Sequence, residues 1–93
     1  MKTFKDLRFK KHYYAKYYKG AKQATMNFEN GFGVSVLIGS CFYSNGVDSY
    51  ELAVLKNGKL CYNSGLTEDV FGRLSAREVT KIMKQVQQLK ITP

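Results

Sequence analysis

Residue types that support catalysis are sparse in this 93-residue sequence. A nucleophilic mechanism needs a serine or cysteine beside an imidazole, and His12 is the one histidine. Glu68 and Asp69 are adjacent carboxylates, but we expect both in a short helical turn capped by Thr67 and ended by Gly72, where the helix dipole favours acidic side chains. No glycine-rich loop precedes a Lys-Ser or Lys-Thr pair, so the P-loop pattern is missing. The sequence therefore predicts a protein that is not an enzyme.

The two cysteines, Cys41 and Cys61, do not form a metal-binding pattern. Neither belongs to a Cys-x-x-Cys pair, and no Cys/His cluster accompanies them. A secreted domain held together by disulfides would usually carry more cysteines. We therefore expect two half-buried free thiols, no metal site and no cofactor. The sequence leaves open whether the two thiols are neighbours.

Cationic and aromatic side chains are interleaved in the stretch RFKKHYYAKYYKG, which runs from Arg8 to Gly20. The net charge of the chain is +8, and residues 1–22 hold eight of the fifteen Lys and Arg residues but one of the seven acids. Seven of the eight net positive charges therefore lie in one quarter of the chain. Such asymmetry indicates an acidic partner, which can be nucleic acid, an acidic protein surface or anionic lipid.

This N-terminal segment is the candidate partner-binding site. Lysine and arginine neutralise phosphates, and tyrosine rings stack on unpaired bases. In the alternative interpretation, the tyrosines cover one end of a sheet and the lysines are merely solvated. The candidate contact residues are Arg8, Lys10, Lys11, Tyr13, Tyr14, Lys16, Tyr17, Tyr18, Lys19 and Lys22.

Residues 23–63 have the pattern of antiparallel hairpins. Turns are expected at Asn30-Gly31 and Asn57-Gly58, because Asn-Gly supplies the positive φ angles of a tight hairpin turn. Apolar residues alternate with polar ones on the flanking runs, as on strands with one face toward a core. We expect four antiparallel strands. The unusually apolar run from Cys41 to Tyr43 can continue the second of them.

Residues 66–90 change to a helical period. Ser75 and Glu78 form a capping box, S-x-x-E, at the start of a helix from about residue 76 to residue 89. Apolar residues at i, i+3, i+4, i+7 and i+10 give one stripe, which should lie across the inner face of the sheet. The stripe consists of Val79, Ile82, Met83, Val86 and Leu89.

The same helix carries a second line of basic residues. Arg77, Lys81 and Lys84 lie at i, i+4 and i+7, on a face offset from the apolar stripe. They are either a second basic contact face or the solvated outer face that is typical of amphipathic helices.

The conformation of residues 1–22 remains open between helix and strand. Tyrosines spaced four residues apart suit a short helix ended by Gly20, whereas paired tyrosines also suit an edge strand. An edge strand such as Gln23–Phe28 could pair with its copy and form a homodimer.

These patterns predict one α+β domain over residues 1–93: a four-stranded antiparallel sheet packed by one long C-terminal helix, with a basic, tyrosine-rich N-terminal segment. No apolar run reaches the ~18 residues of a membrane span. The N-terminus also lacks the apolar region of a secretory signal. We therefore expect a cytoplasmic protein without a membrane partner.

Three stretches share their residues with a known pattern: NGFGVSVLIGS, YELAVLKNGKLCY and LTEDVFGRLSAREVTKIMKQVQQL. They resemble a family of small proteins of phages and prophages, which repeats NG-[YF]-GVSV, YE-x-AVL-x-x-G-x-LCY, T-[DE]-DV-x-G-x-L and EVT-x-IM-x-x-VQ-x-L. The opening FKDLRFKKH also fits, so the resemblance covers most of the chain. It implies a mobile-element origin and supplies no catalytic residues. The chain departs from the family at YYAKYYKGAKQ, which is longer and more basic, so we expect a specialised activity there.

Small phage proteins of this size without catalytic motifs often bind and inhibit a host machine, and anti-CRISPR proteins are the prominent example. On this basis we expect a protein that inhibits a host defence complex in the bacterial cytoplasm. The leading candidate is an anti-CRISPR protein that binds a CRISPR nuclease, a protein or ribonucleoprotein complex, and blocks its nucleic-acid binding or cleavage. The alternatives are an RNA- or DNA-binding regulatory module and a virion accessory protein.

Overall fold

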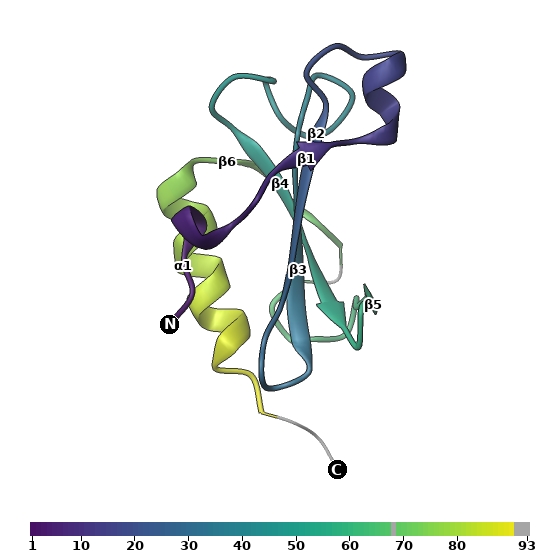
Figure 1. Cartoon of the computed structure of the whole chain (residues 1–93). Helices are drawn as coiled ribbons and strands as arrows, with labels where there is room; N and C mark the ends of the chain where they lie inside the picture. Colours follow the sequence, from purple (N-terminus) through teal and green to yellow (C-terminus); the bar gives the residue numbers. More distant parts are fainter. Residues whose placement is uncertain (68, 91–93) are drawn as a thin grey trace.

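An antiparallel sheet with one helix packed against it forms the fold (Figure 1). The computed structural model describes residues 1–67 and 69–90. The antiparallel sheet and the helix packed against it confirm the expected α+β class. In chain order, with η denoting a short 3₁₀ helix, the elements are η1 Phe4–Asp6, β1 Lys10–Lys11, η2 Tyr13–Lys16, β2 Lys22–Asn27, β3 Phe32–Ile38, β4 Tyr50–Lys56, β5 Lys59–Leu60, β6 Phe71–Leu74 and α1 Ala76–Gln87.

The strands follow the order β1-β2-β3-β4-β5, and β6 pairs with the first half of β4. The prediction of four strands is wrong, because it missed β1 and β6. β1 consists of two lysines and β6 of four residues that include a glycine, so neither shows the apolar alternation that marks a strand. β1 also pairs with Lys22 and Gln23. The first two residues of β2 therefore lie between β1 and β3, and the predicted edge strand, Gln23–Phe28, is an edge only beyond Gln23.

Both Asn-Gly turns are confirmed, but their asparagines have different roles. Asn57 and the glycine after it adopt φ angles of 52° and 79°, as a type I′ hairpin turn requires. In the β2–β3 turn only the glycine has a positive φ, of 85°. Asn30 instead donates from Nδ2 to the backbone carbonyls of Val86 and Leu89, at 2.9 Å each. Its side chain thus ties this hairpin to the C-terminal end of α1.

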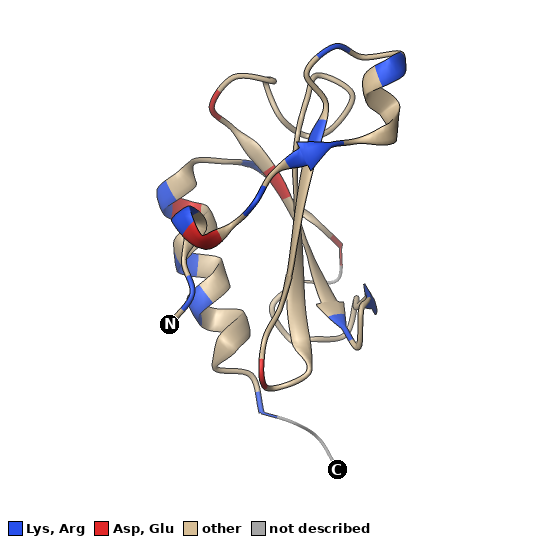
Figure 2. Cartoon of the chain, viewed as in Figure 1, with Lys and Arg blue, Asp and Glu red and all other residues tan. Residues whose placement is uncertain are grey.

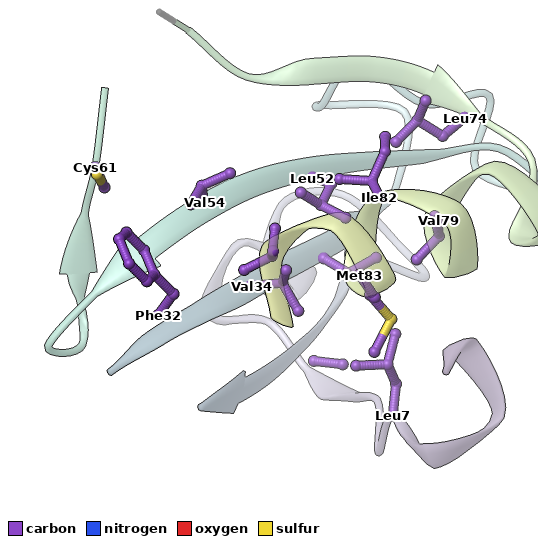
Figure 3. Close-up of a cluster of buried hydrophobic side chains, with 13 residues drawn as sticks. Leu7, Phe32, Val34, Leu52, Val54, Cys61, Leu74, Val79, Ile82 and Met83 are labelled. Carbon is purple, nitrogen blue, oxygen red and sulfur yellow. The ribbon is translucent and has the colours of Figure 1, made fainter. Parts of the chain in front are cut away.

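The predicted capping box starts α1, and four of the five residues of the predicted apolar stripe are buried. The helix ends at Gln87 and not at residue 89, so Leu89 lies beyond it and is half-buried. Ser75 Oγ accepts the Glu78 N–H at 3.1 Å, and Glu78 Oε1 accepts the Ser75 N–H at 3.0 Å. Each fully buried side chain of the stripe adds roughly 1.5–3 kcal/mol of gross stabilisation. Among the described residues, no helix combines the length and apolar character that crossing a membrane needs. Figure 3 shows Val79, Ile82 and Met83 of α1 against Val34, Leu52 and Val54 of the sheet. Val86 of the helix and Val36 of β3 belong to the same buried cluster.

The chain between β5 and α1 differs from the prediction. Gly72 does not end a helical turn but lies inside strand β6. A Cβ atom at Gly72 would lie 2.9 Å from Cβ of Tyr43, so the glycine permits a close approach of two segments. Thr67 Oγ1 accepts the Asp69 N–H at 3.1 Å, but Thr67 does not cap a helical turn as predicted, because Asp69 lies in a bend and β6 begins at Phe71. Glu68 lies outside the described residues.

The N-terminal segment contains both of the expected conformations. η1 and η2 are short helical turns, and β1 lies between them. The backbone N–H of Lys2 donates to Gln87 Oε1 at 2.8 Å, and the N–H of Phe4 donates to Thr80 Oγ1 at 3.0 Å. Leu7 is buried in the core. The start of the chain therefore lies along α1, as Figure 1 shows.

Two capping boxes, Ser75 with Glu78 at the start of α1 and Thr3 with Asp6 at the start of η1, predict a loss of stability in acid. The backbone N–H of Ser75 holds the pKa of Glu78 below its ordinary value of 4.5, and that of Thr3 holds the pKa of Asp6 below 3.8. Both carboxylates therefore stabilise the fold above these ordinary values, and this contribution is lost as pH falls through the lower folded values. We expect Glu78→Gln to flatten the acid limb of urea-unfolding stability measured down to about pH 2, because glutamine keeps the box without titrating.

Glu29 offers the control, because it is an exposed carboxylate without a capping role. Glu29→Gln should leave the acid limb as in the wild type. An equal flattening in both variants would mean that general charge, and not the capping box, sets the acid sensitivity.

Asn30→Asp should destabilise the fold by roughly 1–3 kcal/mol, because a carboxylate would then face the Val86 and Leu89 carbonyls without a proton to donate. Urea unfolding at neutral pH measures the loss. Asn27→Asp places the same charge at the exposed end of β2 and should change the free energy of unfolding by less than about 0.5 kcal/mol. Similar losses in the two variants would contradict the tethering role of Asn30.

Candidate functional site

Most of the predicted contact residues lie at one end of the sheet, in the connection between β1 and β2 (Figure 1). His12 starts η2 with its side chain, because Nδ1 accepts the Tyr14 N–H at 3.0 Å. The Tyr18 N–H donates to the Tyr14 carbonyl at 2.8 Å, and the His12 N–H donates to the Ala21 carbonyl at 2.9 Å. The basic segment is therefore a hydrogen-bonded connection between two strands and not a free arm.

The loop of residues 39–49, between β3 and β4, supports this connection. β3 ends at Ile38, so the expected continuation of the strand through residues 41–43 is wrong. Ser44 Oγ donates to the Ser49 carbonyl at 2.6 Å and accepts the Gly39 N–H at 3.1 Å, which folds the loop back on itself. Phe42 of this run packs against the β1–β2 connection instead of extending the strand.

His12 and Phe42 form the base of an aromatic cluster. Their ring centroids lie 5.1 Å apart in an edge-to-face arrangement. Tyr14 stacks on Phe42 at 6.1 Å, and Tyr13 stacks on His12 at 5.0 Å. Such pairs are stabilising beyond the apolar area that they bury. A phenylalanine from a distant loop thus fixes how the N-terminal rings are presented.

The tyrosines of this connection are exposed. Tyr13 and Tyr17 each expose 70% of their surface, Tyr18 exposes 49% and Tyr14 exposes 37%. A hydrogen bond with the Tyr14 side chain raises the pKa of the Tyr13 phenol above its ordinary value of 10.0. The four rings therefore offer aromatic surface to a partner.

Five exposed lysines accompany the tyrosines. Residues 7–28 contain no Asp or Glu, and Figure 2 shows blue without red from β1 to the start of β2. Lys16 Nζ lies 5.3 Å from the centroid of the Tyr17 ring, within the range of a cation–π contact. We define the tip as the aromatic residues His12, Tyr13, Tyr14, Tyr17, Tyr18 and Phe42 with the lysines Lys10, Lys11, Lys16, Lys19 and Lys22.

The two acids nearest to the supporting loop are engaged within it. Asp48 Oδ1 accepts a hydrogen bond from Asn45 Nδ2 at 2.7 Å, and Glu51 Oε1 accepts the Tyr43 N–H at 3.1 Å. These bonds shape the loop of residues 39–49.

One predicted contact residue does not join the tip. Arg8 donates from Nη1 to the carbonyls of Lys5 and Leu7, at 3.3 Å each, and so folds back toward η1. Conversely, sequence reasoning missed His12 and Phe42 as members of the site. The unusually apolar run around Phe42 could have indicated a packing contact with another segment, but it was interpreted as the continuation of a strand.

The second basic face is larger than the sequence indicated. Because η1 docks beside α1, lysines of the N-terminal segment join those of the helix on one side of the molecule, away from the tip (Figure 2). The two acids of these elements, Asp6 and Glu78, are held in capping boxes. This terminal basic face comprises the exposed residues Lys2, Lys5, Arg77, Lys81 and Lys84.

The two thiols lie at opposite ends of β4, so they are not neighbours. Cys41 belongs to the loop that precedes β4, whereas Cys61 follows β5, which pairs with the last residues of β4. Cys61 is buried, and its thiol donates to Asn63 Oδ1 at 3.2 Å. Within residues 1–67 and 69–90, no three His, Cys, Asp or Glu side chains gather as metal ligands.

Comparison with protein-family models finds no match, and no curated protein or solved structure matches the chain.

Phe42→Ala should loosen the tip while the core stays folded, since Phe42 supports His12 and Tyr14 but lies outside the core cluster. We expect hydrogen exchange of the amides bonded within the β1–β2 connection to accelerate about 2- to 10-fold, as loss of an aromatic pair implies. Tyr62→Ala, which removes a ring exposed by 49% beyond β5, should leave these amides unchanged. Unaltered exchange in Phe42→Ala would contradict the supporting role.

Proposed function

We propose that this chain is a non-enzymatic binding protein that inhibits a host defence complex, with a CRISPR nuclease as the specific target. The observation that carries the proposal is the tip, where four exposed tyrosines stand among five lysines on a hydrogen-bonded connection. The resemblance of the sequence to small phage and prophage proteins supplies the biological setting. In that setting the protein acts in the cytoplasm of the host bacterium.

The tip would occupy a surface of the target that is acidic or carries nucleic acid. Its lysines supply complementary charge, which speeds association and selects the partner. Its tyrosines supply contact area, and tyrosine is among the residue types that dominate binding energy at interfaces. Because hydrogen bonds already order η2, little conformational entropy is lost on binding.

Inhibition by such a surface is stoichiometric. His12 uses Nδ1 to accept the Tyr14 N–H, so this imidazole atom serves the fold and not a nucleophile. The protein then blocks its target by staying bound, one molecule for each complex. A titration against a fixed amount of nuclease would show this as inhibition that saturates near equal molar amounts.

Replacement of Lys10, Lys11, Lys16 and Lys19 by glutamate should strongly weaken inhibition without unfolding the chain, because all four side chains are exposed. The measurement is DNA or RNA cleavage by a panel of guide-loaded CRISPR nucleases. We expect the wild type to block at least one nuclease and the variant to need roughly 100-fold more protein, since like charges at an interface cost several kcal/mol.

The matched control reverses four lysines of the terminal basic face, Lys2, Lys5, Lys81 and Lys84, and so changes the net charge equally. It should retain inhibition within about 5-fold, because rim and remote charges contribute little. Circular dichroism and thermal unfolding verify the fold of both variants. Full cleavage by every nuclease with wild-type protein present, or unimpaired inhibition by the tip variant, would reject the proposal.

A further inference from the structure

Two rings of the tip are placed for contact with a flat group. Tyr13 and Tyr17 each expose 70% of their surface. Tyr13 is backed by the His12 ring, which it stacks on at 5.0 Å and 25°. Lys16 Nζ lies 5.3 Å from the centroid of the Tyr17 ring. Supported aromatic surface with an adjacent cation suits a planar group that has a negative charge beside it.

The lysines of the two strands point to an anion. Lys11 and Lys22 are direct partners in the β1–β2 pair, and Lys10 lies opposite Gln23. Like charges directly opposite one another in an antiparallel pair are destabilising. With no acid between residues 7 and 28, this repulsion has no offset on the same segment. An anionic group bound between Lys11 and Lys22 would relieve it.

We infer that the tip binds single-stranded nucleic acid. Unpaired bases stack on Tyr13 and Tyr17, and phosphates are neutralised by the tip lysines, with the Lys11–Lys22 pair holding one of them. This inference rests on the proposed function, because it names the component of the loaded defence complex that the tip contacts.

Other polyanions use less of this surface. In a duplex the base faces are already stacked on one another, so the tyrosine rings cannot reach them. An acidic peptide can pair with the lysines but brings no planar bases for the rings. An anionic membrane is bound by an amphipathic helix that inserts Trp, Phe or Leu, whereas the strongly exposed rings between residues 13 and 18 are all tyrosines.

The chain carries its own optical reporter for the test. It has seven tyrosines and no tryptophan, and four of the tyrosines belong to the tip. A titration of the full chain with oligothymidylate of about ten nucleotides should therefore quench tyrosine emission. The same strand paired with oligoadenylate should bind several-fold more weakly, and affinity for the single strand should fall steeply with salt.

Substitutions at the rings separate stacking from charge. Tyr13→Ala and Tyr17→Ala should each lower the affinity for oligothymidylate by roughly 5- to 150-fold, the range for one lost base stack. Tyr13→Phe and Tyr17→Phe keep the rings and should bind within about 3-fold of the wild type. Tyr62→Ala is the control at the other end of the sheet and should leave the affinity unchanged.

Equal affinity for single strand and duplex, or alanine variants that bind as the wild type does, would overturn the inference in favour of unselective polyanion binding. The nuclease assay separates this result from the proposed function. Inhibition without oligonucleotide binding would leave the function standing and remove the inference. Stacking-dependent binding without inhibition of any nuclease would support the inference and remove the proposed target.

Discussion

Packing of α1 against β3 and β4 is the constraint on which the rest of the structure depends. Val79, Met83 and Val86 are fully buried there, so the helix has one permitted orientation on the sheet. Its outer face then carries the helical part of the terminal basic face, and its flank receives the backbone of Lys2 and Phe4. Asn30 joins the end of the helix to the first hairpin. These interactions involve the middle of the sheet and one of its ends, which leaves the other end free to carry the tip.

The tip differs from this core in chemistry as well as in position. The core consists mainly of aliphatic side chains in close contact, whereas the tip exposes tyrosine rings and lysine charges to solvent. The direct pairing of Lys11 with Lys22 is unfavourable for the fold alone. Natural proteins retain such local conflicts chiefly at functional sites, where a partner resolves them. The conflict therefore supports a binding role for this end of the sheet.

Features that depend on neighbouring residues were predictable from the sequence. The capping box at Ser75, the apolar stripe after it and the two Asn-Gly turns follow from backbone geometry over a few residues. Features that depend on distant segments were not. Strand β6 exists because β4 offers it a pairing edge, and Gly72 is required there by the approach of Tyr43. In the same way, Asn30 looked like a turn residue, although its side chain serves the end of a helix 56 residues further along the chain.

The sequence by itself determined the α+β class, the two hairpin turns, the start and buried face of the helix, and the concentration of positive charge and tyrosine before residue 23. These properties arise from composition, periodicity and local backbone preferences, which act over short distances along the chain. Tertiary structure alone decided that Phe42 supports the tip, that Arg8 folds away from it, and that η1 adds its lysines to those of α1. The physical reason is that these contacts join segments far apart in sequence, and only the closure of the core brings such segments within reach of each other.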